Sequence, residues 1–110
     1  MTIFELYVQE GCVADESRPV LESALRDVCA DVLGPDALPV EFDWTVIRKG
    51  HGFRGGKPST TSLVRSRIPD GCDSATRGQF LASIGRQWCR IAGATEHEVV
   101  ASARDWSWKG

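Results

Sequence analysis

The stretch GCVADESRPVLESALRDVC at residues 11–29 has a counterpart sixty residues later, GCDSATRGQFLASIGRQWC at residues 71–89. The two stretches align without a gap, with a Gly-Cys pair at the start and a cysteine at the end of each. Matches continue on both sides in the same register, which indicates a duplicated structural unit. The chain is therefore predicted to hold two copies of one unit, at about residues 2–48 and 62–104.

Each copy is predicted to form a strand, a helix and a second strand. Residues 2–8 alternate, with Phe4, Leu6 and Val8 on one side, which is typical of a strand with one buried face. In both copies an apolar stripe at helical spacing follows, and then a second strand. The predicted strands cover residues 2–8, 40–48, 62–68 and 98–104, and the predicted helices run from 17 to 33 and from 73 or 74 to 93.

The order β-α-β-β-α-β predicts an α+β fold, in which a four-stranded mixed sheet carries two helices on one face. The chain, residues 1–110, is predicted to be one domain, and its Gly-rich connector at 49–61 a mobile loop or an exposed hairpin. Each helix has one apolar stripe, so the helices can cover only one face of the sheet. The other face would present Ile3, Tyr7 and Leu63 among charged residues, which predicts a homo-oligomer.

Composition argues against several classes of function. The net charge is −2 without a basic cluster, so a nucleic-acid partner is not expected. No apolar run reaches the roughly 18–20 residues of a membrane span. The first residues show no basic region or cleavage site, which favours a cytoplasmic protein. The four cysteines form no C-x-x-C pair and only two histidines accompany them, so reduced thiols and no metal site are expected.

Three short motifs and the period of sixty resemble the tautomerase superfamily, which includes 4-oxalocrotonate tautomerase and malonate semialdehyde decarboxylase. The opening Met-Thr-Ile-Phe-Glu-Leu-Tyr-Val-Gln-Glu-Gly is similar to the family's first strand, which begins Met-Pro. The ending Asp105-Trp106-Ser107-Trp108 is similar to an Asp-Trp-Ser-Phe found late in the decarboxylase branch. Arg65-Ser66-Arg67 resembles the arginine pair of that branch and of its dehalogenase relatives.

The resemblance implies a cofactor-independent enzyme that assembles as a trimer, with its site around the amino terminus between subunits. The family's catalytic group is an amino-terminal proline, exposed when the initiator methionine is removed. Here that position is Thr2. Without Met1, the α-amine of Thr2 would serve as a general base around neutral pH. With Met1 in place, the amine would lie one residue away, about 3.5 Å along the strand, and the usual proton transfer would be lost.

Arg65 and Arg67 are two residues apart on a predicted strand and share a face, so together they would grip a carboxylate or stabilise an enolate. With Thr2 they are the predicted catalytic residues. The alternative is that they form ion pairs with Glu5 or with acidic residues of a neighbouring subunit. Glu5 and Tyr7 are predicted on the same face, Glu5 as a base or as the ion-pair partner of Arg65, and Tyr7 for hydrogen bonding or packing.

Four further residues complete the predicted substrate-binding set, and the expected substrate is a small anionic molecule. Trp106 and Trp108 would wall an apolar pocket or anchor a subunit interface. His51 and Arg54 lie in the Gly-rich connector, which would either close over a ligand as a lid or remain a solvated loop.

Three functions fit these residues. The leading one is a cofactor-independent isomerase or lyase of tautomerase type, acting by proton transfer on a small oxo-acid or enolisable metabolite. It includes a diverged biosynthetic isomerase or cyclase. The second is a cofactor-free monooxygenase of the dimeric α+β-barrel type, which shares the element order. The third is a non-catalytic ligand-binding or interaction module, favoured by the absence of the amino-terminal proline.

Overall fold

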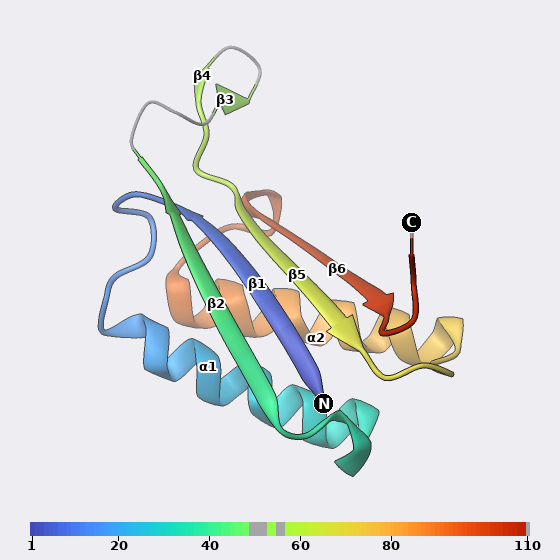
Figure 1. The fold of residues 1–110 in the computed structure, drawn as a ribbon. Helices are drawn as coiled ribbons and strands as arrows, with labels where there is room; N and C mark the ends of the chain where they lie inside the picture. Colours follow the sequence, from blue (N-terminus) through green and yellow to red (C-terminus); the bar gives the residue numbers. More distant parts are fainter. Residues whose placement is uncertain (49–52, 55–56, 110) are drawn as a thin grey trace.

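The computed structural model describes residues 1–48, 53–54 and 57–109, with side chains at 1–48 and 59–109. Two β-α-β units follow one another, and β3 and β4 form a short antiparallel hairpin between them (Figure 1). The strands are β1 (Thr2–Gln9), β2 (Val40–Ile47), β3 (Phe53–Arg54), β4 (Lys57–Pro58), β5 (Ser62–Ile68) and β6 (Val99–Asp105), and the α-helices are α1 (Ser17–Val28) and α2 (Ser74–Ala92).

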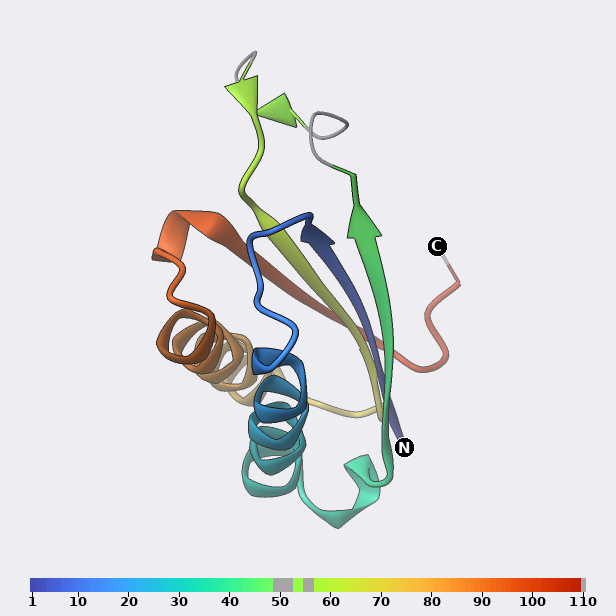
Figure 2. The ribbon, with the colours of Figure 1, turned by 90° about the vertical axis from the view of Figure 1, so that its left-hand side faces the viewer.

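The four long strands form one mixed sheet in the order β2-β1-β5-β6. Strand β1 runs parallel to β2 and β5 parallel to β6, while β1 and β5 pair antiparallel at the centre. Both helices lie on the same face of the sheet, and no described helix covers the opposite face (Figures 1 and 2). The predicted α+β fold, with two helices on one face of a four-stranded mixed sheet, is confirmed.

The strand order separates this fold from the barrel type assumed in the monooxygenase alternative. In each unit of this chain, the two strands that flank a helix are direct neighbours in the sheet. In a ferredoxin-like fold the β-α-β unit is split, so that another strand lies between them. The monooxygenase alternative is based on the order of helices and strands along the chain. Because the strands are arranged differently in the sheet, that shared order does not support it.

Alternation along the strands decides which side chains enter the core. Phe4, Leu6 and Val8 of β1 point toward the helices and are buried, as the period-2 pattern predicts. Helix α2 contributes Phe80 and Trp88, which are also fully buried. Burial of a side chain such as Phe80 stabilises the fold by about 1.5–3 kcal/mol. These contacts fix the helices to one face and leave the other face, which carries both polar and apolar side chains, uncovered by a described helix (Figure 2).

The first helix ends earlier than predicted. A single helix over 17–33 is wrong in its last turns, because α1 ends at Val28 and the chain continues as a π-helical turn, Cys29–Leu33. The amide of Gly34 closes this turn by donating to the Cys29 carbonyl at 3.1 Å. Gly34 has a φ of 91° and Pro35 follows it, so the chain cannot continue as an α-helix.

Candidate functional site

The uncovered face of the sheet (the open face) brings together four of the predicted site residues. Glu5 is paired in register with Arg65, and Tyr7 and Arg67 follow at the same alternation, so all four share this face as predicted. Carboxylates gather on the β2 side and guanidiniums toward β6. The described side chains are, strand by strand, Glu41, Asp43 and Thr45 on β2, Ile3, Glu5 and Tyr7 on β1, Leu63, Arg65 and Arg67 on β5, and Val100, Ser102 and Arg104 on β6.

Glu5 is the centre of the polar contacts on the open face. Its Oε1 lies 3.5 Å from Arg104 Nη2, and its Oε2 accepts a hydrogen bond from the Tyr7 hydroxyl at 3.2 Å. The ion pair of Glu5 is therefore with Arg104 and not with Arg65, the partner that the sequence suggested. The Arg104 side chain reaches from β6 across β5 to this carboxylate, whereas Arg65, the register partner of Glu5, forms no ion pair with it.

Arg65 and Arg67 lie on β5 on the open face, and both side chains are half-buried. Within the described residues, neither guanidinium has a hydrogen bond or an ion pair. Arg67 lies beside Ile3 on β1 and beside Arg104 on β6, so three arginines occupy adjoining positions. Such a cluster, with two members lacking an internal partner, is suited to an external anion.

Arg104 also lies against the C-terminal turn (residues 105–108). Its guanidinium is 5.2 Å from the centroid of the Trp108 ring, a cation–π contact. The turn emerges on the open-face side of the sheet (Figure 2), and Trp106 and Trp108 are 40% and 50% exposed. Sequence reasoning missed Arg104, because the repeat of sixty aligns it with Trp44, on the core side of β2. In the structure Thr2 pairs with Val40 but Ser62 pairs with Val99, and this shift by one residue turns Arg104 to the open face.

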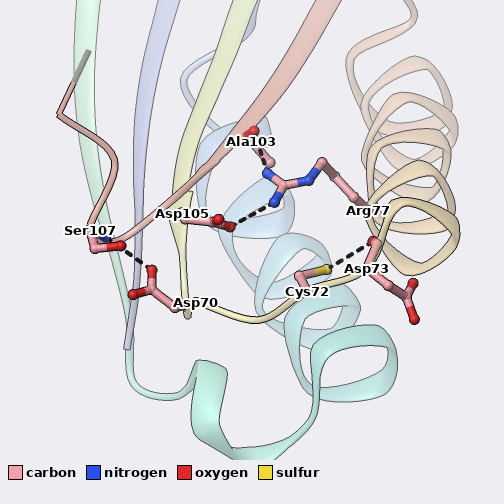
Figure 3. A network of polar contacts seen from close by, with 7 residues as sticks. All are labelled: Asp70, Cys72, Asp73, Arg77, Ala103, Asp105 and Ser107. Atoms are coloured by element: carbon pink, nitrogen blue, oxygen red, sulfur yellow. Dashed lines mark hydrogen bonds and ion pairs between the residues drawn. The ribbon is translucent and has the colours of Figure 1, made fainter.

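A second group of contacts fixes the end of β6 and the C-terminal turn (Figure 3). Arg77 of α2 donates to the Ala103 carbonyl at 2.8 Å and forms an ion pair with Asp105 at 2.6 Å. Asp70, in the loop after β5, accepts a hydrogen bond from the Ser107 amide at 3.0 Å. This bond from Ser107 holds the pKa of Asp70 below its ordinary value.

Thr2 belongs to the core and not to the open face. It is fully buried, its hydroxyl donates to the Ala37 carbonyl at 2.8 Å, and its amide donates to the Pro39 carbonyl at 3.1 Å. It shares this environment with Cys29, where burial raises the thiol pKa to about 11, although a hydrogen bond with Thr2 acts in the opposite direction. The side chain of Thr2 therefore cannot reach a ligand on the open face.

The free α-amine of the described chain is that of Met1. Its ammonium group donates to the Asp36 carbonyl at 2.6 Å. With Met1 in place, the nitrogen of Thr2 is an amide and cannot act as a base. Amine catalysis by Thr2 therefore applies only to a chain that has lost Met1, and it stays a prediction.

Two hollows of the described chain lie away from the open face. The larger, about 760 Å³, lies between α2 and β6 and is lined by Leu81, Ala82, Gly85, Arg86, Cys89, Glu96, Val99 and Ala101. The smaller, about 240 Å³, includes Asp36, Asp70 and Asp73 in its lining, which makes it unfavourable for an anion. In a single chain, the candidate site on the open face is therefore a surface and not one of these hollows.

The connector residues of the predicted site cannot be placed in the same way. His51 lies outside the described residues, and only the main chain of Arg54, in β3, is described, so their role as a lid stays a prediction. Among the described residues, no group of three or more His, Cys, Asp or Glu side chains could hold a metal ion. None of the helices described here is both long enough and apolar enough to cross a membrane.

Several solved structures have the architecture described above. No protein-family model and no curated protein matches the sequence. The crystal structure of native Ps01740 aligns with a TM-score of 0.87 at 22% identity, over 97% of this chain and 99% of that chain. Pt0534 inactivated by 2-oxo-3-pentynoate gives 0.84 at 18% identity, and Q0 fused 4-OT, a symmetric trimer, gives 0.84 at 14% identity. Each of these two matches covers 94% of this chain and 84% of the other.

The chain has the fold of these solved structures, which include fused 4-OT. Identities of 14–22% establish the fold and leave the chemistry to be argued from this chain's own residues. In this chain the second residue is Thr2, and on the open face the described polar contacts gather around Glu5 and Arg104.

Proposed function

We propose that this chain is a cofactor-independent isomerase or lyase that moves a proton on a small anionic oxo-acid at the open face. The observation that carries the proposal is the position of Arg65 and Arg67, which have no ion-pair partner among the described residues and lie beside the Glu5–Tyr7 pair. Pt0534, which shares the fold, is inactivated by 2-oxo-3-pentynoate, itself a small 2-oxo acid, and this supports the substrate class.

The proposed reaction starts when Arg65 and Arg67 bind the substrate carboxylate and the neighbouring carbonyl oxygen. Glu5 removes a proton from the carbon next to the carbonyl. The electron pair of the broken C–H bond forms the C=C bond of an enolate, and the carbonyl π pair moves to the oxygen, where the guanidiniums stabilise the charge. The Glu5 carboxyl group then returns the proton to the far carbon of a C=C bond that is conjugated with the enolate, or to the original carbon where there is no such bond. As the C=C electron pair takes up this proton, an electron pair of the enolate oxygen re-forms the carbonyl. Tyr7 keeps the carboxyl group oriented through its hydrogen bond.

The α-amine of Thr2 is a second candidate for the base in a chain that has lost Met1. The described contacts favour Glu5, because it lies in the register row of Arg65, whereas the Thr2 nitrogen is bonded to Pro39. The connector residues His51 and Arg54 remain proposed contributors to substrate binding, as do the exposed rings of Trp106 and Trp108.

A homotrimer is proposed as the assembled form. Leu63 and Val100 on the open face are 39% and 51% exposed, and an adjoining subunit would bury them and turn the surface into a cleft. Q0 fused 4-OT, which shares the fold, is a symmetric trimer. Light scattering is expected to give three times the 12.1 kDa of one chain, and a monomer or dimer mass would contradict the trimer. The proposed location is the cytoplasm, where the free thiols would stay reduced.

A non-catalytic binding module is the second candidate function. Two observations favour it: Thr2 is buried, and the Met1 ammonium group donates a hydrogen bond to the Asp36 carbonyl. Neither residue then offers an amine that could act as a base on the open face. Such a module would bind the anion at Arg65 and Arg67 without turnover, so binding and proton transfer must be measured separately.

Replacing Arg65 and Arg67 together by methionine tests the anion site. Each charge-assisted contact contributes about 1.5 kcal/mol, so the Kd for 2-oxobutanoate in isothermal titration is expected to rise about 100-fold. The matched control is Arg86→Met with Arg90→Met, two exposed arginines of α2, which should leave the Kd within about twofold. An unchanged Kd in the open-face double variant would remove the main support for the proposal.

A further inference from the structure

Three main-chain amides fix the C-terminal turn, two by bonds to the rest of the protein and one by a bond within the turn. The Trp106 amide donates to the Ile68 carbonyl at 2.8 Å, which extends the β5–β6 pairing by one residue. The Trp108 amide then donates to the Asp105 carbonyl at 3.0 Å and closes the turn. Between them, the Ser107 amide donates to Asp70 Oδ1 at 3.0 Å (Figure 3). Of these three acceptors, only that of Asp70 belongs to a side chain.

The path of this turn decides where the Trp108 ring lies. Trp108 is half exposed, and its described ring contact is with the guanidinium of Arg104, at 5.2 Å. Residues 106–108 lie outside any helix or strand, so their path depends on the contacts that hold them. The tie nearest to Trp108 from outside the turn is the Asp70–Ser107 bond, because it acts on the preceding residue.

The end of β6 is fixed independently of Asp70. Arg77 binds both the Ala103 carbonyl and the Asp105 carboxylate, at 2.8 and 2.6 Å, and so anchors the strand up to residue 105. Loss of the Asp70 contact is therefore expected to release residues 107–109 and to leave β6 in place. The lowered pKa of Asp70 agrees with a carboxylate that accepts a hydrogen bond from the Ser107 amide.

We propose that Asp70 is a positioning residue for the anion site. By holding the Ser107 amide, it places the Trp108 ring against Arg104, and Arg104 in turn holds Glu5 at 3.5 Å. The Trp108 ring, which lies against the arginine cluster, thus depends on the carboxylate of Asp70, 37 residues away from Ser107 in sequence. The expected effect of Asp70 on anion binding rests on the function proposed above, whereas its effect on the position of Trp108 does not.

The two Asp70 variants separate the hydrogen bond from the rest of the side chain. Asp70→Ala removes the acceptor, whereas Asp70→Asn keeps an oxygen that can receive the Ser107 amide. In the full chain labelled with 5-fluorotryptophan, the ¹⁹F resonance assigned by Trp108→Phe is expected to move toward the free amino acid in Asp70→Ala. It should stay in place in Asp70→Asn and in the control Asp27→Ala, an exposed aspartate of α1. An unmoved resonance in Asp70→Ala, or an equal shift in Asp70→Asn, would overturn the proposal.

Titration with 2-oxobutanoate then tests the connection to the anion site. A cation–π contact at an exposed position contributes a few-fold to an equilibrium constant, so Asp70→Ala is expected to raise the Kd about three- to fivefold and Asp70→Asn less than about twofold. A shifted Trp108 resonance with an unchanged Kd would overturn the link between Asp70 and the site. If the unmodified chain binds no 2-oxobutanoate, the proposed function fails, while the resonance shift still decides whether Asp70 positions Trp108.

Discussion

Replacing Glu5 by glutamine is expected to slow proton exchange at C3 of 2-oxobutanoate by about 100-fold, down to the rate in buffer, because a positioned general base contributes about 10²–10⁴ to a rate. Glutamine keeps the shape of the side chain and an oxygen for the Tyr7 hydroxyl, but its amide cannot accept a proton from carbon. The Kd should change by less than about threefold, since Arg65 and Arg67 are untouched. The rate is measured in D₂O by loss of the C3 proton signal.

Glu41→Gln is the matched control for this variant. Glu41 is a carboxylate of the same face, but it lies on the edge strand β2 beside Ile3 and away from the arginines, so its replacement should leave the exchange rate within about twofold. A Glu5→Gln variant that keeps most of the wild-type rate would contradict the role of Glu5. If the intact mass of that active protein also lacks Met1, the Thr2 amine becomes the base.

Replacing Trp88 by alanine is expected to lower the free energy of unfolding by about 3–5 kcal/mol, measured by urea denaturation. Trp88 is fully buried on α2, with its ring centroid 6.0 Å from that of Trp44, so alanine would leave a large cavity beneath the sheet. Trp88→Phe should lose less, about 1–2 kcal/mol. Phenylalanine keeps an aromatic ring and removes an indole N–H that has no hydrogen-bond partner within the described residues.

Trp106→Ala provides the contrast for the Trp88 variants. Trp106 is 40% exposed in the C-terminal turn, so its loss should change the free energy of unfolding by about 0.5 kcal/mol or less. If Trp88→Ala were as stable as Trp106→Ala, this would contradict the burial of Trp88 between α2 and the sheet. If Trp88→Ala does not fold at all, the Trp88→Phe variant still gives the measurement.

The architecture was accessible from sequence because it depends on local periodicity. Alternation in residues 2–8 and 62–68 predicts two strands that each bury one face, and the apolar stripes predict helices that cover the same face. The N-cap of α2 at Asp73 is likewise a local feature, and the structure shows its side chain accepting from the Thr76 amide at 2.7 Å. The end of α1 was less accessible, because the π-helical turn before Gly34 has no signal in the apolar pattern.

The candidate site was predictable only in part, because its contacts join distant strands. That Glu5, Tyr7, Arg65 and Arg67 share a face follows from alternation and the repeat register. The choice of Arg104 over Arg65 as the partner of Glu5 depends on how a long side chain crosses β5, which spacing alone does not reveal. The Asp70–Ser107 bond is likewise a contact between loops that only the folded chain brings together.

Thr2 shows how a family resemblance can outweigh a simpler signal. The alternation that places Phe4, Leu6 and Val8 in the core also places Thr2 there, since it is two residues before Phe4. The resemblance predicts instead that Thr2 is a catalytic residue. In the structure Thr2 is buried, as the alternation predicts. With Met1 in place, the polar side chains of β1 that a ligand can reach are Glu5 and Tyr7, on the open face.

Deuterium exchange into 2-oxobutanoate by the unmodified protein tests the central claim most directly, because it detects proton transfer next to a carbonyl without requiring the natural substrate. The open-face site predicts loss of the C3 proton signal about 100-fold faster than in buffer, with the enhancement removed by Arg65→Met with Arg67→Met. Exchange at the buffer rate by a folded protein that binds the 2-oxo acid would contradict catalysis at this face and would leave the binding module as the function.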